Sequence, residues 1–196
     1  MKILMSVIAY LIGAIPTGFV VYYLSEKKDI RRFGSGSTGA TNVLRLKGWK
    51  YAVPVLVFDL LKGFLPVYIS LLLFENRQIA LLSAVFAVLG HCFPVYIRFK
   101  GGKGVATTFG AFAPLALGPV GIALAVFILT VMLTRYVSLG SLLATASLIP
   151  SIFFLTRDLG LTDIAAVVFL VVCLRHSGNI KRLFSGKERK FRTKDQ

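Results

Sequence analysis

The sequence predicts an all-α polytopic membrane protein with about seven transmembrane helices, and three observations carry that prediction. Hydrophobic residues make up 56% of the 196-residue chain, whose mean hydropathy is +0.78. A chain of this kind is too apolar for an ordinary soluble domain. Its apolar residues form runs about as long as a bilayer is thick, and its basic residues cluster between those runs. The length suits one domain, so we expect residues 1–196 to form a single integral membrane domain.

The apolar runs predict the spans in chain order. The first run, residues 3–24, is about 22 residues long, or ~33 Å as a helix. It is too long for the core of a signal peptide, and no small-residue cleavage site follows it. The other clear runs cover residues 51–74, 79–97, 136–155 and 161–174, of which the last is short.

Residues 105–133 are long for one crossing and short for two. Gly118-Pro119 lies in the middle and predicts a helix break. With two crossings, 19 of the 23 Lys and Arg residues fall on one side, in segments 25–50, 98–103, 135 and 175–196. A single crossing would move the basic C-terminal segment to the opposite side, against the positive-inside rule. We therefore expect two short crossings, seven spans in all, with the N-terminus outside and the C-terminus in the cytoplasm.

The charge and cysteine content limit the function classes. The net charge of +15 could indicate nucleic acid binding, but the basic residues sit in loops between spans, so no nucleic acid partner is expected. Cys92 and Cys173 are the only cysteines, so we expect no disulfide framework. Together with His91 and His176 they lack metal-ligand spacing, so we expect buried thiols, no metal and no cofactor.

The first polar segment reads FGSGSTGATNVLR, from Phe33 to Arg45. Its GxGxxG pattern has no preceding strand, so it is not a dinucleotide fold. Glycine backbones, hydroxyl groups and an arginine can nevertheless bind an anion, whereas a plain linker would not need Asn42 and Arg45 on one helical face. The candidate anion-binding residues are Gly34, Ser35, Gly36, Ser37, Gly39, Thr41, Asn42 and Arg45.

The second segment reads GHCFPVYIRFKGGKGVATT and fails the P-loop pattern, because Gly104 follows Lys103 where Ser or Thr is needed. Its glycines and lysines precede a helix whose N-terminus favours anions, although a juxtamembrane turn with snorkelling lysines is the alternative. His91 is costly at the end of a span unless it is paired, and it is a candidate proton acceptor. The candidate binding residues are Lys100, Gly101, Gly102, Lys103 and Gly104.

The third segment reads RHSGNIKRLFSGKE and leaves the last span. Lys181 and Arg182 are candidate substrate-binding residues, although a basic tail on anionic lipid is the alternative for both. That alternative does not explain His176, Asn179 and Glu188.

Asp59 and Lys62 lie three residues apart inside the second span, on one helical face. Intramembrane charges are expensive, and their mutual pairing explains how they are tolerated. We expect a structural pair that braces the site rather than direct chemistry.

Taken together, GSGSTGATNVLR, GHCFPVYIRFKGGKGVAT and RHSGNIKRLFSGKE resemble the three cytoplasmic motifs of the bacterial acyl-phosphate:glycerol-3-phosphate acyltransferases, the PlsY family. The resemblance covers essentially the whole chain and includes DLLKG in the second span. The HxxxxD motif of the acyl-CoA-using class is absent, since Tyr96 stands where the Asp would follow His91.

The resemblance implies that the 1-hydroxyl of sn-glycerol 3-phosphate attacks the carbonyl of a fatty acyl phosphate, giving lysophosphatidic acid and inorganic phosphate. It implies that Ser35 and Ser37 hold the acyl-phosphate head group, while Arg45 neutralises charge. Lys103 and its neighbouring glycines would hold the phosphate of glycerol 3-phosphate. The remaining implied roles are orientation of the acceptor by His176 and Asn179, bracing of the tail by Glu188, and lining of the site by Thr41 and Asn42.

Three questions stay open at this stage. The general base is either His91 or the phosphate of the donor. The two glycine-rich segments could hold the two phosphates in the opposite arrangement. The rival functions are a small membrane anion transporter, for which this sequence lacks the expected internal repeat, and a lipid-binding scaffold, for which the histidines would be superfluous.

We expect a monomer in the bacterial inner membrane, in contact with membrane lipids, with its active site on the cytoplasmic face.

Overall fold

The computed structural model describes residues 1–74 and 76–191, and this part of the chain is helical and contains no strand. The all-α prediction is therefore confirmed. The chain divides into two compact units, Met1–Leu115 and Ala116–Gln196. The expectation that residues 1–196 act as one domain stays a prediction.

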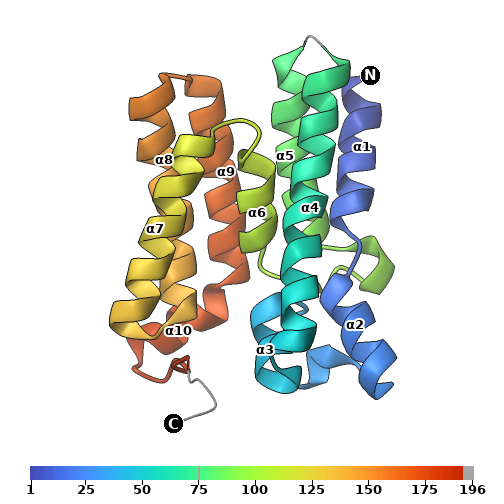
Figure 1. Cartoon of the computed structure of the whole chain (residues 1–196), viewed down its shortest axis with the longest axis vertical. Helices are drawn as coiled ribbons and strands as arrows, with labels where there is room; N and C mark the ends of the chain where they lie inside the picture. The colour runs from blue at the N-terminus through green and yellow to red at the C-terminus, as the bar shows by residue number, and fades with distance from the viewer. Residues whose placement is uncertain (75, 192–196) are drawn as a thin grey trace. The chain divides into compact units, whose positions relative to one another are not determined.

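The first unit contains six α-helices and two short 3-10 helices among its described residues (Figure 1). These elements are α1 (Lys2–Gly13), α2 (Thr17–Glu26), η1 (Ile30–Arg32), α3 (Ala40–Lys47), α4 (Trp49–Leu73), α5 (Arg77–Cys92), η2 (Val95–Ile97) and α6 (Val105–Phe112). Within the second unit, the described residues form α7 (Leu117–Thr134), α8 (Val137–Thr156), α9 (Leu159–Arg175) and α10 (Ser177–Phe184).

Five helical segments in the described part are long and apolar enough to cross a membrane, in agreement with the predicted membrane class. They are Lys2–Glu26, Trp49–Leu73, Arg77–Ile97, Leu117–Thr134 and Val137–Thr156. The pair α9 and α10, bent by 67° where they meet, makes a sixth if it is counted as one broken span. The count of seven and the orientation of the termini stay predictions.

The predicted helix break at Gly118-Pro119 is wrong, because both residues lie in the first turn of α7. Proline is tolerated there, since the first N–H groups of a helix have no intrahelical acceptor. The break instead falls between Phe112, where α6 ends, and Leu117, where α7 begins. With 8 residues, α6 is only ~12 Å long, too short to cross a bilayer by itself.

The first span is broken in a way that its continuous apolar sequence did not indicate. α1 ends at Gly13 and α2 begins at Thr17, with Pro16 at the N-cap of α2. Proline has no N–H and disfavours helical geometry in the residue before it. The break leaves the carbonyl of Ile15 available to a side chain from another helix, and Lys62 uses it.

Glycines allow the helices of the first unit to pack closely. A Cβ added to Gly13 of α1 would lie 2.1 Å from the carbonyl oxygen of Ala87 in α5, and one added to Gly90 would lie 2.2 Å from that of Tyr10. Gly63 of α4 meets the carbonyl of Thr107 in α6 in the same way, at 2.2 Å. Small residues let membrane helices approach backbone to backbone. These contacts hold α1 against α5 and α4 against α6.

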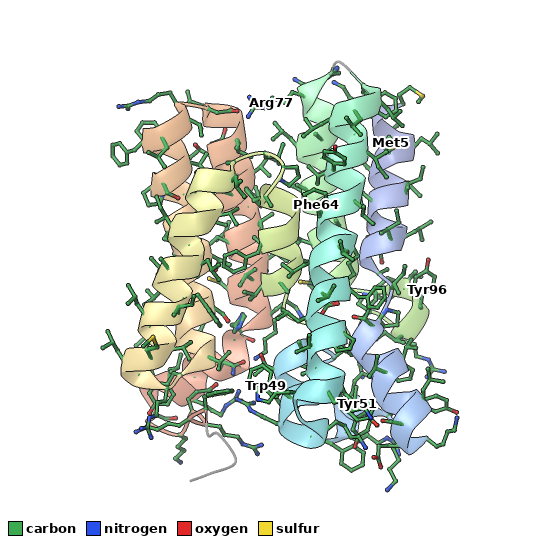
Figure 2. The ribbon with its side chains drawn as sticks, viewed as in Figure 1. Met5, Trp49, Tyr51, Phe64, Arg77 and Tyr96 are labelled. Carbon is green, nitrogen blue, oxygen red and sulfur yellow. The ribbon has the colours of Figure 1, made fainter. Side chains whose placement is uncertain are left out.

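The first unit has two chemically different ends. Figure 2 shows Trp49 and Tyr51 at one end of α4, Phe64 about half-way along it, and Met5 and Arg77 at the opposite end. α2 and α3 lie at the Trp49 end (Figure 1). The segment from Ser25 to Lys50, with its lysines, arginines and glycines, belongs to that end. The polar chemistry of the first unit is therefore concentrated away from Arg77.

Candidate functional site

The Ser35 loop, residues 33–39, joins η1 to α3 and depends on glycine. Gly34 and Gly36 have φ angles of +61° and +71°, in the left-handed region that glycine adopts without steric cost. The side chains of Ser35 and Arg45 are exposed, while Ser37 and Thr41 are half-buried. A ligand can thus reach the hydroxyl of Ser35 and the guanidinium of Arg45 from solvent.

Asn42 holds the Ser35 loop in shape. Its Oδ1 accepts a hydrogen bond from the backbone N–H of Ser35 (2.9 Å), and its Nδ2 donates to the carbonyls of Phe33 (3.2 Å) and Ser37 (2.9 Å). The side chain is buried, and a Cβ on Gly34 would lie 2.2 Å from its Oδ1. Sequence analysis assigned Asn42 to the lining of the site. That role stays a prediction, and the contacts show that Asn42 also shapes the loop.

The Gly102 loop, residues 98–104, follows η2 and leads into α6. Gly101, Gly102 and Gly104 are buried, Lys103 is half-buried and Lys100 is exposed. The backbone N–H of Gly102 donates to the carbonyl of His91 (3.0 Å), so this amide shapes the loop. Gly104 is the N-cap of α6 with φ +87°, which places Lys103 directly before a helix N-terminus. That position favours an anion.

The two loops are tied together by Arg31, which sequence analysis did not select. Its Nη1 donates to the carbonyl of Ile97 in η2 (2.7 Å), and its Nη2 pairs with Asp29 (2.7 Å). The guanidinium also lies 5.4 Å from the ring centre of Phe19. Hydrogen bonds from Arg31 hold the pKa of the Asp29 carboxyl below its ordinary value. Arg31 thus connects the segment before the Ser35 loop to the segment before the Gly102 loop.

The predicted Asp59–Lys62 pair is present and buried inside the first unit. Lys62 Nζ lies 2.8 Å from Asp59 Oδ1, and the same oxygen accepts a hydrogen bond from Thr17 Oγ1 (2.5 Å). His91 Nδ1 is 3.6 Å from that oxygen. Asp59, Lys62 and His91 have exposed fractions of 1%, 6% and 6%. His91 is therefore enclosed among charged and polar groups at the end of α5.

Glu188 organises the polar cluster of the second unit. Its Oε1 accepts hydrogen bonds from Asn179 Nδ2 (2.6 Å) and Ser138 Oγ (2.8 Å), and its Oε2 accepts one from Arg182 Nε (2.8 Å). Burial raises the pKa of the Glu188 carboxyl, but these three hydrogen bonds outweigh burial and bring it below its ordinary value. Sequence analysis missed Ser138. Glu188 joins α10 to α8, although its bracing role in the reaction stays a prediction.

His176 is buried at the junction of α9 and α10, and Lys181 and Arg182 are exposed on α10. The Nδ1 of His176 lies 2.9 Å from the carbonyl oxygen of Val172. A carbonyl can only accept, so Nδ1 carries the proton, which leaves Nε2 as the accepting nitrogen of the neutral ring.

Among the described residues, no group of three or more His, Cys, Asp or Glu side chains could hold a metal ion.

A family model described as glycerol-3-phosphate acyltransferase matches residues 3–186. The chain belongs to the glycerol-3-phosphate acyltransferase family. This membership confirms the family resemblance of the three polar segments. Together with the apolar spans, it makes the chain an integral membrane acyltransferase.

Curated relatives agree with this family over nearly their whole length. The chain is 46% identical to a glycerol-3-phosphate acyltransferase of Syntrophotalea carbinolica, over 96% of this chain and 97% of the relative. It is 42% identical to the enzyme of that name from Endomicrobium trichonymphae, over 97% of this chain and 96% of the relative. It is 43% identical to the one from Yersinia pestis, over 95% and 85%.

Solved structures of this acyltransferase family have the same fold. The chain matches PlsY (YgiH), an integral membrane glycerol 3-phosphate acyltransferase, in its glycerol 3-phosphate form, with a TM-score of 0.93 and 37% identity over 98% of this chain and 96% of that one. It matches the lysophosphatidic acid form of PlsY with a TM-score of 0.90 and 36% identity, with the same coverage.

Proposed function

We propose that this acyltransferase uses a fatty acyl phosphate as its donor and makes lysophosphatidic acid and inorganic phosphate from glycerol 3-phosphate. The observation that carries the proposal is the pair of glycine-rich loops in the first unit, tied together by Arg31. Each loop has a cation close to it in the sequence, Arg45 in the helix that follows the first loop and Lys103 within the second. Two glycine-rich loops, each with a cation, suit a reaction in which donor and acceptor both carry a phosphate.

The related PlsY structures support the choice of acceptor and product, because one holds glycerol 3-phosphate and the other lysophosphatidic acid. The absence of an Asp at Tyr96, five residues after His91, supports an acyl phosphate donor over acyl-CoA. Acceptor orientation by His176 and Asn179 rests on the resemblance and stays a prediction.

The proposed chemistry needs no covalent enzyme intermediate. The 1-hydroxyl oxygen of glycerol 3-phosphate bonds to the acyl carbonyl carbon, and the bond from that carbon to the phosphate oxygen breaks. The hydroxyl proton goes to the departing phosphate or, in the alternative, to His91. Because a mixed anhydride has a good leaving group, orientation of the reactants and charge stabilisation can supply most of the acceleration.

In this scheme Ser35 and Arg45 hold the donor phosphate, and Lys103 at the N-terminus of α6 holds the acceptor phosphate. The basic segment at the Trp49 end of the first unit favours the cytoplasmic side of the bacterial inner membrane. The proposed site therefore faces cytoplasmic glycerol 3-phosphate, while the acyl chain remains among the membrane lipids.

The test is phosphate release by the purified protein in detergent. Acyl phosphate and glycerol 3-phosphate are supplied together and then separately, and acyl-CoA replaces acyl phosphate in a parallel reaction. We expect phosphate release that requires the acceptor, with lysophosphatidic acid as the lipid product. Transfer from acyl-CoA releases CoA and no phosphate, so lysophosphatidic acid is measured in that reaction. Its formation from acyl-CoA but not from acyl phosphate would overturn the donor assignment. Binding of both anions without any product would instead favour the small anion transporter.

A further inference from the structure

The polar cluster at the centre of the first unit contains more groups than an isolated ion pair needs. Asp59 Oδ1 lies 2.8 Å from Lys62 Nζ and accepts a hydrogen bond from Thr17 Oγ1 at 2.5 Å. His91 Nδ1 lies farther from the same oxygen, at 3.6 Å. Lys62 Nζ also donates to the carbonyl of Ile15 (2.9 Å), which the helix break before Thr17 exposes. The cluster thus draws on α2, α4, α5 and the break between α1 and α2.

Stability alone is a weak reason to keep such a cluster in the membrane. Replacing a buried ion pair by well-packed apolar side chains is often neutral or stabilising. Ionisable groups inside membrane helices are expensive and are usually retained for function. None of the proposed chemical steps needs Asp59, Lys62 or Thr17.

His91 connects this cluster to the Gly102 loop. Its backbone carbonyl accepts the N–H of Gly102 at 3.0 Å, and a Cβ on Gly101 would lie 2.3 Å from the same oxygen. Its ring faces Gly102, because a Cβ on Gly102 would lie 2.0 Å from Nε2. One side of the ring therefore points to Asp59, while the other lies against the backbone immediately before Lys103.

We propose that Asp59 is a positioning residue for the acceptor phosphate, acting through His91 on the Gly102 loop. Thr17 and Lys62 fix the carboxylate, the carboxylate fixes the imidazole, and the imidazole fixes the backbone that presents Lys103 and the start of α6. This inference rests on the proposed binding of the acceptor phosphate at Lys103. It assigns His91 to positioning, in place of the general base that the sequence suggested.

Steady-state kinetics separates the two roles of His91. With His91→Gln we expect KM for glycerol 3-phosphate to rise about tenfold or more while kcat changes by less than about threefold, because a loosened loop weakens binding of the acceptor. A general base would give the opposite pattern, with kcat reduced by about two to four decades at unchanged KM. That pattern, or no change in either constant, would overturn the proposal.

Thr17 tests the cluster without leaving a buried charge unpaired. Thr17→Val removes the hydroxyl that holds Asp59 and should raise KM for glycerol 3-phosphate about threefold to tenfold, whereas Thr17→Ser should restore the wild-type value. The matched control is Ser83→Ala. It removes a buried hydrogen bond between Ser83 of α5 and Ser70 of α4, the helices that carry His91 and Asp59, and should leave KM unchanged. Equal KM shifts in Thr17→Val and Ser83→Ala would overturn the proposal.

A double variant tests the path through Gly102. If His91 acts through this glycine, His91→Gln combined with Gly102→Ala should raise KM little more than the stronger single change does. If the increases in KM of the two single variants multiplied in the double variant, the proposed path from His91 through Gly102 would be contradicted. Titration calorimetry of glycerol 3-phosphate on wild type and Thr17→Val measures the same difference without turnover, so failure of the proposed reaction would be seen separately from failure of this inference.

Discussion

The Ser35 loop and the Gly102 loop have similar composition but are supported differently. The Ser35 loop is largely exposed, and one buried amide side chain, that of Asn42, holds it through three hydrogen bonds. In the Gly102 loop the glycines are buried while residues 98–100 are exposed, and the backbone and ring of His91 lie against Gly101 and Gly102. Gly34 and Gly36 provide left-handed turns in the first loop, whereas Gly101 and Gly102 allow close packing in the second. Similar glycine-rich sequences can therefore depend on different neighbours.

Asn42→Ala is the strongest test of how the Ser35 loop is supported. The change removes all three supports of the Ser35 loop at once, and displacement of a binding group by about 1 Å can cost 10²-fold in rate. We expect kcat/KM to fall about 10²- to 10³-fold, measured by phosphate release at limiting acyl phosphate. Ser25→Ala, which removes one hydrogen bond within α2, is the control. A loss below tenfold would show that the loop keeps its shape without Asn42.

Substitution of the two cations sharpens the contrast by assigning a phosphate to each loop. Hydrogen bonds to charged groups contribute about 1.5–3 kcal/mol, which is a factor of about 10 to 100 in binding. We expect Lys103→Ala to raise KM for glycerol 3-phosphate by this factor and Arg45→Ala to raise KM for acyl phosphate. The measurement is KM for each substrate with the other saturating. The reverse pattern would mean that the two assignments must be exchanged.

Arg31→Ala should remove the connection between the two loops and lower kcat/KM by a smaller factor. The variant loses the hydrogen bond to the carbonyl of Ile97 as well as the pair with Asp29, and we expect kcat/KM to fall about tenfold. The neighbouring Arg32→Ala removes the same charge from an exposed position and serves as the control. If both variants lose activity equally, Arg31 contributes charge rather than a connection.

The smallest expected effect concerns pH and the Glu188 cluster of the second unit. The folded-state pKa of Glu188 lies below its ordinary value of 4.5, so its contribution to stability is present above that value and is lost as pH falls through the lower folded pKa. The thermal midpoint of the wild type should therefore decrease as the pH is lowered from 4.5 towards the lower folded-state pKa. The decrease should be smaller in Glu188→Gln, which has no carboxyl to protonate. Parallel curves would exclude Glu188 as a source of this dependence.

Much of the fold could be predicted because hydropathy and length report directly on membrane spans. The runs at residues 51–74 and 136–155 became α4 and α8 with shifts of one or two residues at their ends. Helix breaks were harder to predict. Pro119 indicated a break but lies in the first turn of α7, whereas Pro16 lies at a break within a run taken as one span. Proline is compatible with both locations, so sequence alone does not separate them.

The candidate site was predictable where composition carries chemistry, as in the glycines, hydroxyls and cations of the three polar segments. It was not predictable where a role depends on tertiary contact. Thr17, Arg31 and Ser138 each bind a group that lies far along the chain, respectively Asp59, the carbonyl of Ile97 and Glu188. Nothing in the sequence around Thr17 or Ser138 distinguishes them. The close spacing of Asp29 and Arg31 was the only local signal for the connection between the loops.

The Asp59–Lys62 pair also bears on how the chain enters the bilayer. The two residues lie one turn apart near the middle of α4 and meet at 2.8 Å within that helix. The counter-ion is therefore available as soon as the helix forms, before any neighbouring helix has packed against it. A nascent α4 can partition into lipid with its two internal charges already paired. The α1–α2 segment, which is synthesised earlier, can then supply Thr17 and the carbonyl of Ile15 as the helices assemble.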